Sequence, residues 1–84
     1  MNNYKLENDT ITVSVRYDGE KVLTSEVVNG KIVDLKKPII GAWCIQARPN
    51  QEGTYLEGIG IYSVCYELTE KDAHNRALDY LKKV

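Results

Sequence analysis

The chain has 84 residues with 43% hydrophobic and 27% charged side chains, which is an ordinary composition for a soluble globular protein. We therefore expect a single domain over residues 1–84 with a thin core. Eleven basic and twelve acidic side chains give a net charge of −1. This balance provides no strong attraction to nucleic acid or to an anionic membrane, and no segment is long and apolar enough to span a bilayer.

Turn signals divide the first half of the chain at the spacing of an antiparallel meander: Asn8-Asp9, Asp18-Gly19 and Asn29-Gly30. Apolar and polar residues alternate between these turns, and this alternation predicts four short strands: 3–7, 10–17, 21–28 and 31–35. Pro38 cannot donate a backbone hydrogen bond, so we expect it to end this part of the pattern.

The second half of the chain predicts two longer strands. Residues 39–48 are apolar on both faces, which is typical of a central strand. Residues 49–54 form a polar loop, and residues 55–67 are predicted to be one long strand. Gly58 and Gly60 lie on the same face of that strand, which indicates a bulge, a bend, or a close approach by another backbone or a ligand.

A single helix is predicted over Thr69–Val84. Thr69 is a favourable N-cap, and Asp72 three residues later completes an acidic capping box. Small and apolar residues then recur at helical spacing and form one narrow stripe: Ala73, Ala77, Tyr80, Leu81 and Val84. We expect this helix to lie close against one face of the sheet.

These elements predict an α+β fold, in which a curved antiparallel meander of five or six strands is covered on one face by the C-terminal helix. A partly closed small barrel is the main variant, and Gly41, Gly58 and Gly60 are its expected bend points.

No motif predicts a catalytic, cofactor or metal site, so we expect a protein that is not an enzyme. Gly58-Ile59-Gly60 lacks the third glycine and the helix of a dinucleotide-binding loop, so its glycines are expected to serve backbone geometry. His74 has no nearby ligand partner and is interpreted as a surface residue. Cys44 and Cys65 do not form a metal-binding pattern, and the expected hairpin places Cys44 opposite residues 59–63. We therefore expect two reduced thiols and, with no apolar signal-peptide core at the N-terminus, a cytoplasmic location.

The strands at 39–48 and 55–67 are apolar on both faces, while one helix can cover only one face. Something else must cover the second face: sheet closure, a second copy of the chain or a partner. Tyrosine and tryptophan suit such partly exposed contact surfaces. The expected partner-binding residues lie on these strands and beside the polar loop: Trp43, Arg48, Tyr55, Tyr62 and Tyr66.

The sequence therefore favours a small protein-interaction protein that binds a protein partner or itself through an aromatic sheet face. An inhibitor, an adaptor and an assembly subunit all fit, including an accessory protein of a virus or mobile element that blocks a host enzyme. The alternative is a small-molecule binding domain with a pocket between sheet and helix. A nucleic-acid surface would require four basic residues to gather at one end of the sheet, and the acidic balance opposes it: Lys31, Lys36, Lys37 and Arg48.

Overall fold

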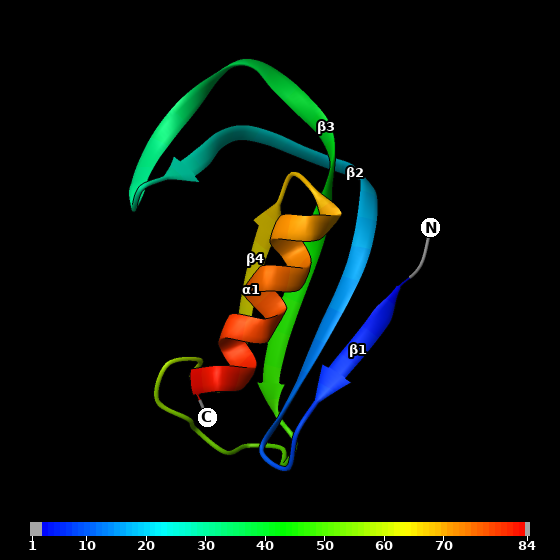
Figure 1. The fold of residues 1–84 in the computed structure, drawn as a ribbon, viewed down its shortest axis with the longest axis vertical. Coiled ribbons are helices and arrows are strands. Elements are labelled where there is room, and N and C mark those ends of the chain that lie inside the picture. Colours follow the sequence, from blue (N-terminus) through cyan, green and yellow to red (C-terminus); the bar gives the residue numbers. More distant parts are fainter. Residues whose placement is uncertain (1–2, 84) are drawn as a thin grey trace.

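The computed structural model describes residues 3–83, which form one antiparallel sheet and one helix (Figure 1). The elements in chain order are β1 (Tyr4–Glu7), β2 (Ile11–Val28), β3 (Lys31–Pro49), β4 (Ser63–Glu67) and α1 (Glu70–Lys83). The sheet order is β1-β2-β3-β4, and every neighbouring pair is antiparallel. This confirms an α+β meander with a C-terminal helix. The sheet has four strands instead of the five or six predicted, and within residues 3–83 it is open, with β1 and β4 as its edges.

The predicted hairpin at Asp18-Gly19 is wrong, because strands 10–17 and 21–28 are two parts of the continuous β2. A two-residue hairpin of this kind needs positive φ, and neither Asp18 nor Gly19 has it. The Asp18 carboxylate instead accepts a hydrogen bond from the Glu20 amide at 3.0 Å. Residues 19–21 form a bulge opposite Gly41, and a bulge of this kind bends a strand instead of reversing it.

A second irregularity joins the predicted strands 31–35 and 39–48 into β3. The pairing passes from Leu23↔Ile39 to Ser25↔Asp34, so that residues 35–38 of β3 lie opposite the single residue Thr24. Pro38 therefore lies where the ladder is interrupted and its missing N–H costs no pairing. The turn predicted at Asn29-Gly30 is confirmed: both residues have positive φ, 51° and 79°.

The predicted strand 55–67 exists only as β4, and residues 56–61 form a turn. Gly58 and Gly60 have φ of 97° and 69°, which an extended strand does not allow. The Gly60 amide donates to the Leu56 carbonyl at 2.7 Å, and the Leu56 amide donates back to the Gly60 carbonyl at 3.1 Å. This tight turn places Ile59 in the core, with 5% of its surface exposed. Backbone geometry is thus what these glycines supply.

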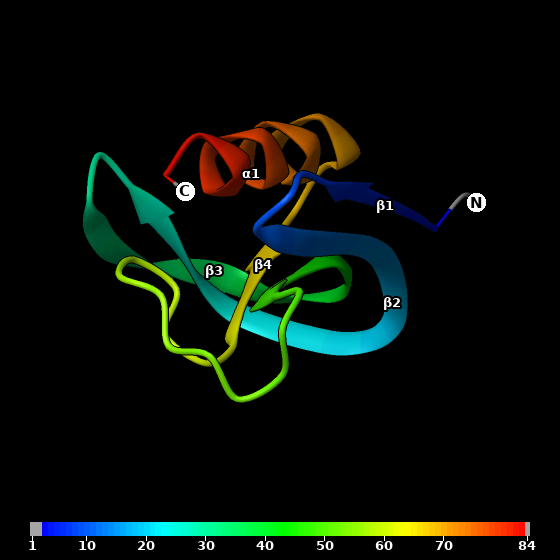
Figure 2. The same cartoon turned by 90° about the horizontal axis from the view of Figure 1, so that it is seen from below.

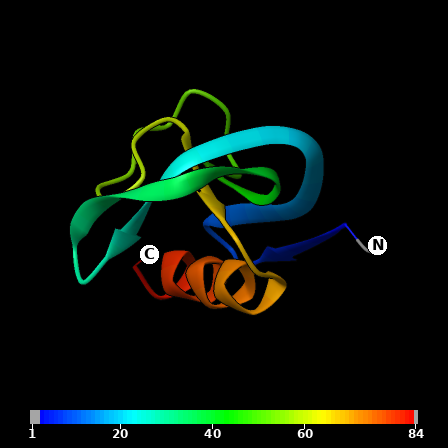
Figure 3. The ribbon, with the colours of Figure 1, turned by 90° about the horizontal axis from the view of Figure 1, so that it is seen from above.

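The helix covers one side of the sheet, as the views along the long axis show (Figures 2 and 3). Thr69 caps it as predicted, since its hydroxyl accepts a hydrogen bond from the Asp72 amide at 3.1 Å. The buried helix residues are Ala73, Ala77 and Tyr80, and Val84 lies outside the described residues. The sheet contributes most of the remaining core: Ile11, Val13, Val15, Trp43, Ile45 and Ala47.

Candidate functional site

The part of the fold that α1 covers is called the body here (residues 3–20 and 41–83). Above it, β2 and β3 continue as a two-stranded ribbon, which we call the arm (residues 21–40; Figure 1). The arm presents seven exposed aliphatic side chains: Val22, Val27, Val28, Ile32, Val33, Ile39 and Ile40. Their exposed fractions range from 37% at Ile39 to 78% at Ile32. Sequence reasoning missed the arm because the false hairpin at residues 18–19 divided its strands. The signal available in the sequence was valine and isoleucine at consecutive positions, which places apolar groups on both faces of a ribbon.

The arm bends toward the β4 side of the body, away from β1, and its tip turns toward the side on which α1 lies (Figures 1, 2 and 3). Residues paired across antiparallel strands share a face. Val27 and Ile32 form one such pair, and both line a cleft between the arm and the body. Val33 pairs with Glu26, one position along, and so lies on the outer face together with Val28.

The cleft beneath the arm has a volume of about 360 Å³. Its arm wall is mainly apolar, with Leu23, Val27 and Ile32. The body wall is formed by residues of β4, of the turn that follows it and of the first turns of α1: Cys65 to Leu68, Asp72 and Arg76. Arg76 donates a hydrogen bond to the Glu67 carboxylate at 3.0 Å, and this bond raises the pKa of Arg76. The cleft thus combines apolar side chains with a charged rim.

A partly buried hydroxyl and thiol cluster lies next to this cleft. The hydroxyls of Ser63 and Tyr80 are 2.9 Å apart, and the Tyr80 hydroxyl donates to Cys65 Sγ at 3.6 Å. Burial raises the pKa of the Cys65 thiol and of the Tyr80 hydroxyl. Ser63 and Cys65 thus both contact Tyr80, and these contacts join β4 to α1. His74 Nδ1 lies 2.8 Å from the hydroxyl of Tyr4 and joins α1 to β1.

The predicted aromatic surface does not form as one patch. Trp43 points to the helix side, packs edge-on against Tyr17 with ring centroids 5.3 Å apart, and is only 6% exposed. Tyr66 pairs with Cys44 and lies on the other side of β4, where Lys21 Nζ is 4.4 Å from its ring centroid. Trp43 therefore belongs to the core. Cys44 lies opposite Tyr66 and not opposite residues 59–63 as expected. Both thiols are free as predicted. Cys65 pairs with Ile45, the neighbour of Cys44, so the two thiols lie on opposite faces of the sheet.

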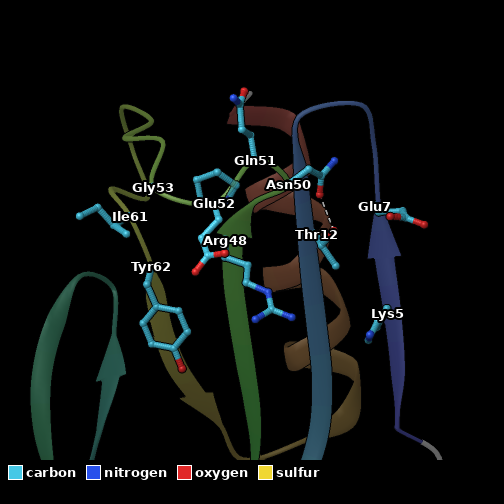
Figure 4. A pocket seen from close by; sticks show the side chains of 11 residues that line it. Lys5, Glu7, Thr12, Arg48, Asn50, Gln51, Glu52, Gly53, Ile61 and Tyr62 are labelled. Carbon is cyan, nitrogen blue, oxygen red and sulfur yellow. Dashed lines mark hydrogen bonds between the residues drawn. The ribbon is translucent and has the colours of Figure 1, made fainter.

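The other predicted residues lie on or near the uncovered face. Arg48 and Tyr62 line a cleft of about 650 Å³ under the loop at 49–53, together with Lys5 and Thr12 (Figure 4). The Thr12 hydroxyl bonds to the Asn50 side chain and fixes that loop over the sheet. Tyr55 is 74% exposed in the turn that follows. The structure brings Arg48 and Tyr62 together, and binding by any of these residues remains a prediction.

The four basic residues proposed for a nucleic-acid surface are separated. Lys31, Lys36 and Lys37 lie on the arm, whereas Arg48 lies near the opposite end of β3, beside the cleft of Figure 4. Within residues 3–83 no group of three or more histidine, cysteine or acidic side chains could hold a metal ion. In the same range no helix has the length and apolarity needed to cross a membrane.

Comparison with known proteins adds no relative: no family model matches the chain, and neither a curated protein nor a solved structure matches it significantly.

Proposed function

We propose that this chain is a small protein-interaction protein that binds a partner through the aliphatic side chains of the arm. The observation that carries the proposal is the exposure of seven large aliphatic residues on one projecting ribbon. Contiguous apolar surface outside the core marks an interaction site in soluble proteins. The arm takes the place of the aromatic sheet face that the sequence predicted, and Arg48, Tyr55, Tyr62 and Tyr66 become a second, more polar surface.

The energetics favour a ribbon that serves binding. A two-stranded ribbon without a packed face is marginally stable in water. Burial of a valine or isoleucine contributes about 1.5–3 kcal/mol, so a partner that covers three or four arm residues would offset the cost of association. The arm is anchored in the rigid body at its base, which limits the conformational entropy lost on binding.

This function fits an inhibitor, an adaptor or an assembly subunit, and we place the protein in the cytoplasm on the basis of its two thiols. An accessory protein of a virus or mobile element that blocks a host enzyme is the variant suggested by its small size. A second copy of the chain is the other partner that the arm can serve, and the oligomeric state in solution distinguishes these two cases.

The test is capture of a partner by the immobilised protein, followed by affinity measurement with the purified partner. Val27→Glu combined with Ile32→Glu should reduce affinity at least about 100-fold, because two charges would be buried without partners. Leu78→Glu is the matched control: Leu78 is 37% exposed but lies on α1, and the affinity of this variant should remain within about 2-fold. Equal losses in both variants, or no loss in either, would contradict binding through the arm.

Binding of a small polar molecule is a second candidate, and the cleft of Figure 4 is the observation that favours it. The space between sheet and helix, where the sequence placed such a pocket, is filled by the core. The cleft under the loop at 49–53 is instead lined by two basic and two acidic residues, and Lys5 and Arg48 are the ones that could bind an anion beside Glu7 and Glu52. A panel of small carboxylates and phosphates should raise the melting temperature, and Arg48→Gln should remove the effect.

A further inference from the structure

The outer edge of β4 faces the cleft beneath the arm. Among the strands of the described residues, β4 is the last in the sheet and pairs only with β3. Within residues 3–83, no other backbone group forms a hydrogen bond with Ser63–Glu67. An unpaired strand edge presents a row of N–H and C=O groups that can accept another strand. Residues Cys65 to Leu68 line the cleft, so part of this edge is accessible from it.

The arm stands away from this edge and does not pair with it. No Cα atom of β2 lies within 8 Å of a Cα atom of β4, whereas paired strands lie about 4.8 Å apart. The space between them is the cleft of about 360 Å³, with Leu23, Val27 and Ile32 on its arm side. An extended segment placed there can form backbone hydrogen bonds with β4 while alternate side chains contact these aliphatic groups.

The charge of the cleft specifies the segment further. Three charged side chains face it: Glu67, Asp72 and Arg76. Their sum is −1, and Arg76 is already bonded to Glu67. Within residues 3–83 the Asp72 carboxylate has no ion-pair partner. Glu26 also contributes atoms to the lining, but it pairs with Val33 and its side chain shares the outer face of the arm. A lysine or arginine in the segment would therefore meet acidic groups, whereas an acidic segment would be repelled.

We propose that the cleft beneath the arm binds an extended segment of a partner protein as a fifth strand on β4, and that this segment alternates aliphatic with basic residues. The inference rests on the proposed function and specifies how the partner engages the inner face of the arm. Backbone pairing supplies affinity, and the apolar arm wall and acidic rim supply selectivity.

The test uses the full chain and three fluorescently labelled synthetic peptides: one with alternating valine and lysine, one with glutamate in place of lysine, and one valine–lysine peptide with every backbone nitrogen methylated. Affinity is measured by anisotropy up to about 1 mM peptide. Amide hydrogen exchange of Ser63–Glu67 reports whether a strand is added. The valine–lysine peptide should bind and slow exchange at β4. The glutamate peptide should bind at least about 10-fold more weakly, and the methylated peptide should not bind, because neither of its edges can donate backbone hydrogen bonds to β4.

Two variants test whether the peptide binds in the cleft beneath the arm. Ile32→Ser on the inner face removes apolar surface without adding charge and should weaken the valine–lysine peptide at least about 10-fold, and Val33→Ser on the outer face should leave its affinity within about 2-fold; circular dichroism confirms that both variants are folded. Binding without slower exchange at β4 would overturn strand addition and leave docking on the arm intact. No binding at 1 mM would also overturn the proposal. Exchange at β4 that slows with protein concentration and without peptide would identify a second copy as the occupant and overturn the partner segment.

Discussion

The body and the arm are built from the same two strands, yet they present their apolar residues to opposite environments. In the body, Val13, Val15 and Ile45 are fully buried beneath α1. Past the bulge at residues 19–21, Ile32 and Ile40 are 78% and 72% exposed. The residue types are alike and the strand pairing continues, so composition does not separate the two regions. What separates them is a covering layer, because α1 packs on the body and leaves the arm without one (Figure 1).

This difference teaches that two uses of aliphatic residues can share one pair of strands. In the body they stabilise the fold by removing about 25 cal/mol of unfavourable hydration per Å² of apolar surface. On the arm the same hydration cost remains in the free protein and is relieved on association. Mutations should therefore affect stability in one region and binding in the other.

Ile45→Ala should have the largest effect on folding. Ile45 is fully buried between Val15 and Cys65 on adjacent strands, and truncation to alanine in such a site costs about 2–5 kcal/mol. Ile32→Ala, at 78% exposure, should change the free energy of unfolding by less than about 0.5 kcal/mol. Urea denaturation measures both. Similar losses in the two variants would show that the arm is packed in solution, which would remove the contrast between the regions.

Gly41→Ala should have the next largest effect, because it acts where the body passes into the arm. Gly41 has a φ of 96°, and a Cβ there would overlap the Tyr17 hydroxyl. Backbone strain and steric overlap together should cost about 2–4 kcal/mol.

Gly30→Ala is the matched control for this prediction. Gly30 also has positive φ, at 79°, but a Cβ added there, at the tip of the arm, would meet no atom within 4 Å. Its cost should be the backbone term only, about 1 kcal/mol. Thermal or urea unfolding measures the loss of stability in both variants. If Gly30→Ala cost as much as Gly41→Ala, the whole effect would come from positive φ and not from overlap with Tyr17.

The helix and the hairpin at Asn29-Gly30 could be predicted because each depends on local chemistry. The Thr69 cap and the spacing of Ala73 and Ala77 are contained within one helix. The bulge at Asp18-Gly19 could not be predicted in this way. It depends on Gly41, more than twenty residues away, which adopts the conformation that lets Tyr17 pass over it. The same dipeptide, Asp18-Gly19, is thus compatible with a local turn and with a bulge that depends on a distant residue.

The candidate site was predicted less well than the fold. Alternation shows which residues share a face but does not show whether a layer covers that face. Trp43 was therefore assigned to a binding surface although Tyr17 and the core bury it. The turn at residues 56–60 was predicted to be strand for a similar reason, since Gly58 and Gly60 indicate a bend but not its direction. Register and coverage are properties of the assembled chain.

Alkaline pH should weaken the body at the junction of β4 and α1. Burial raises the pKa of Cys65 above its usual 9.0 and that of Tyr80 above its usual 10.0. The unfolded chain therefore loses these protons first, so the stabilisation is complete below about pH 9 and is lost as the pH rises through the folded-state values. Cys65→Ser removes the thiol and should make the free energy of unfolding less dependent on pH just above pH 9. An unchanged slope in that variant would assign the alkaline loss to the tyrosines.

Arg76→Gln should have the smallest effect on stability, and it tests the cleft between the two regions. The pair with Glu67 has side-chain exposures of 43% and 20%, and exposed pairs contribute up to about 1 kcal/mol, which salt reduces further. We expect a loss of about 0.5 kcal/mol in the free energy of unfolding at low salt. The substitution also changes the summed charge of the side chains that face the cleft from −1 to −2, so the valine–lysine peptide should bind about 2–5-fold more tightly at low salt, and this gain should disappear at high salt. Lys71→Gln removes an equal charge from α1 outside the lining of this cleft and should change peptide affinity less. If the two variants gave the same gain, the attraction would come from the net charge of the chain and not from the acidic rim beneath the arm.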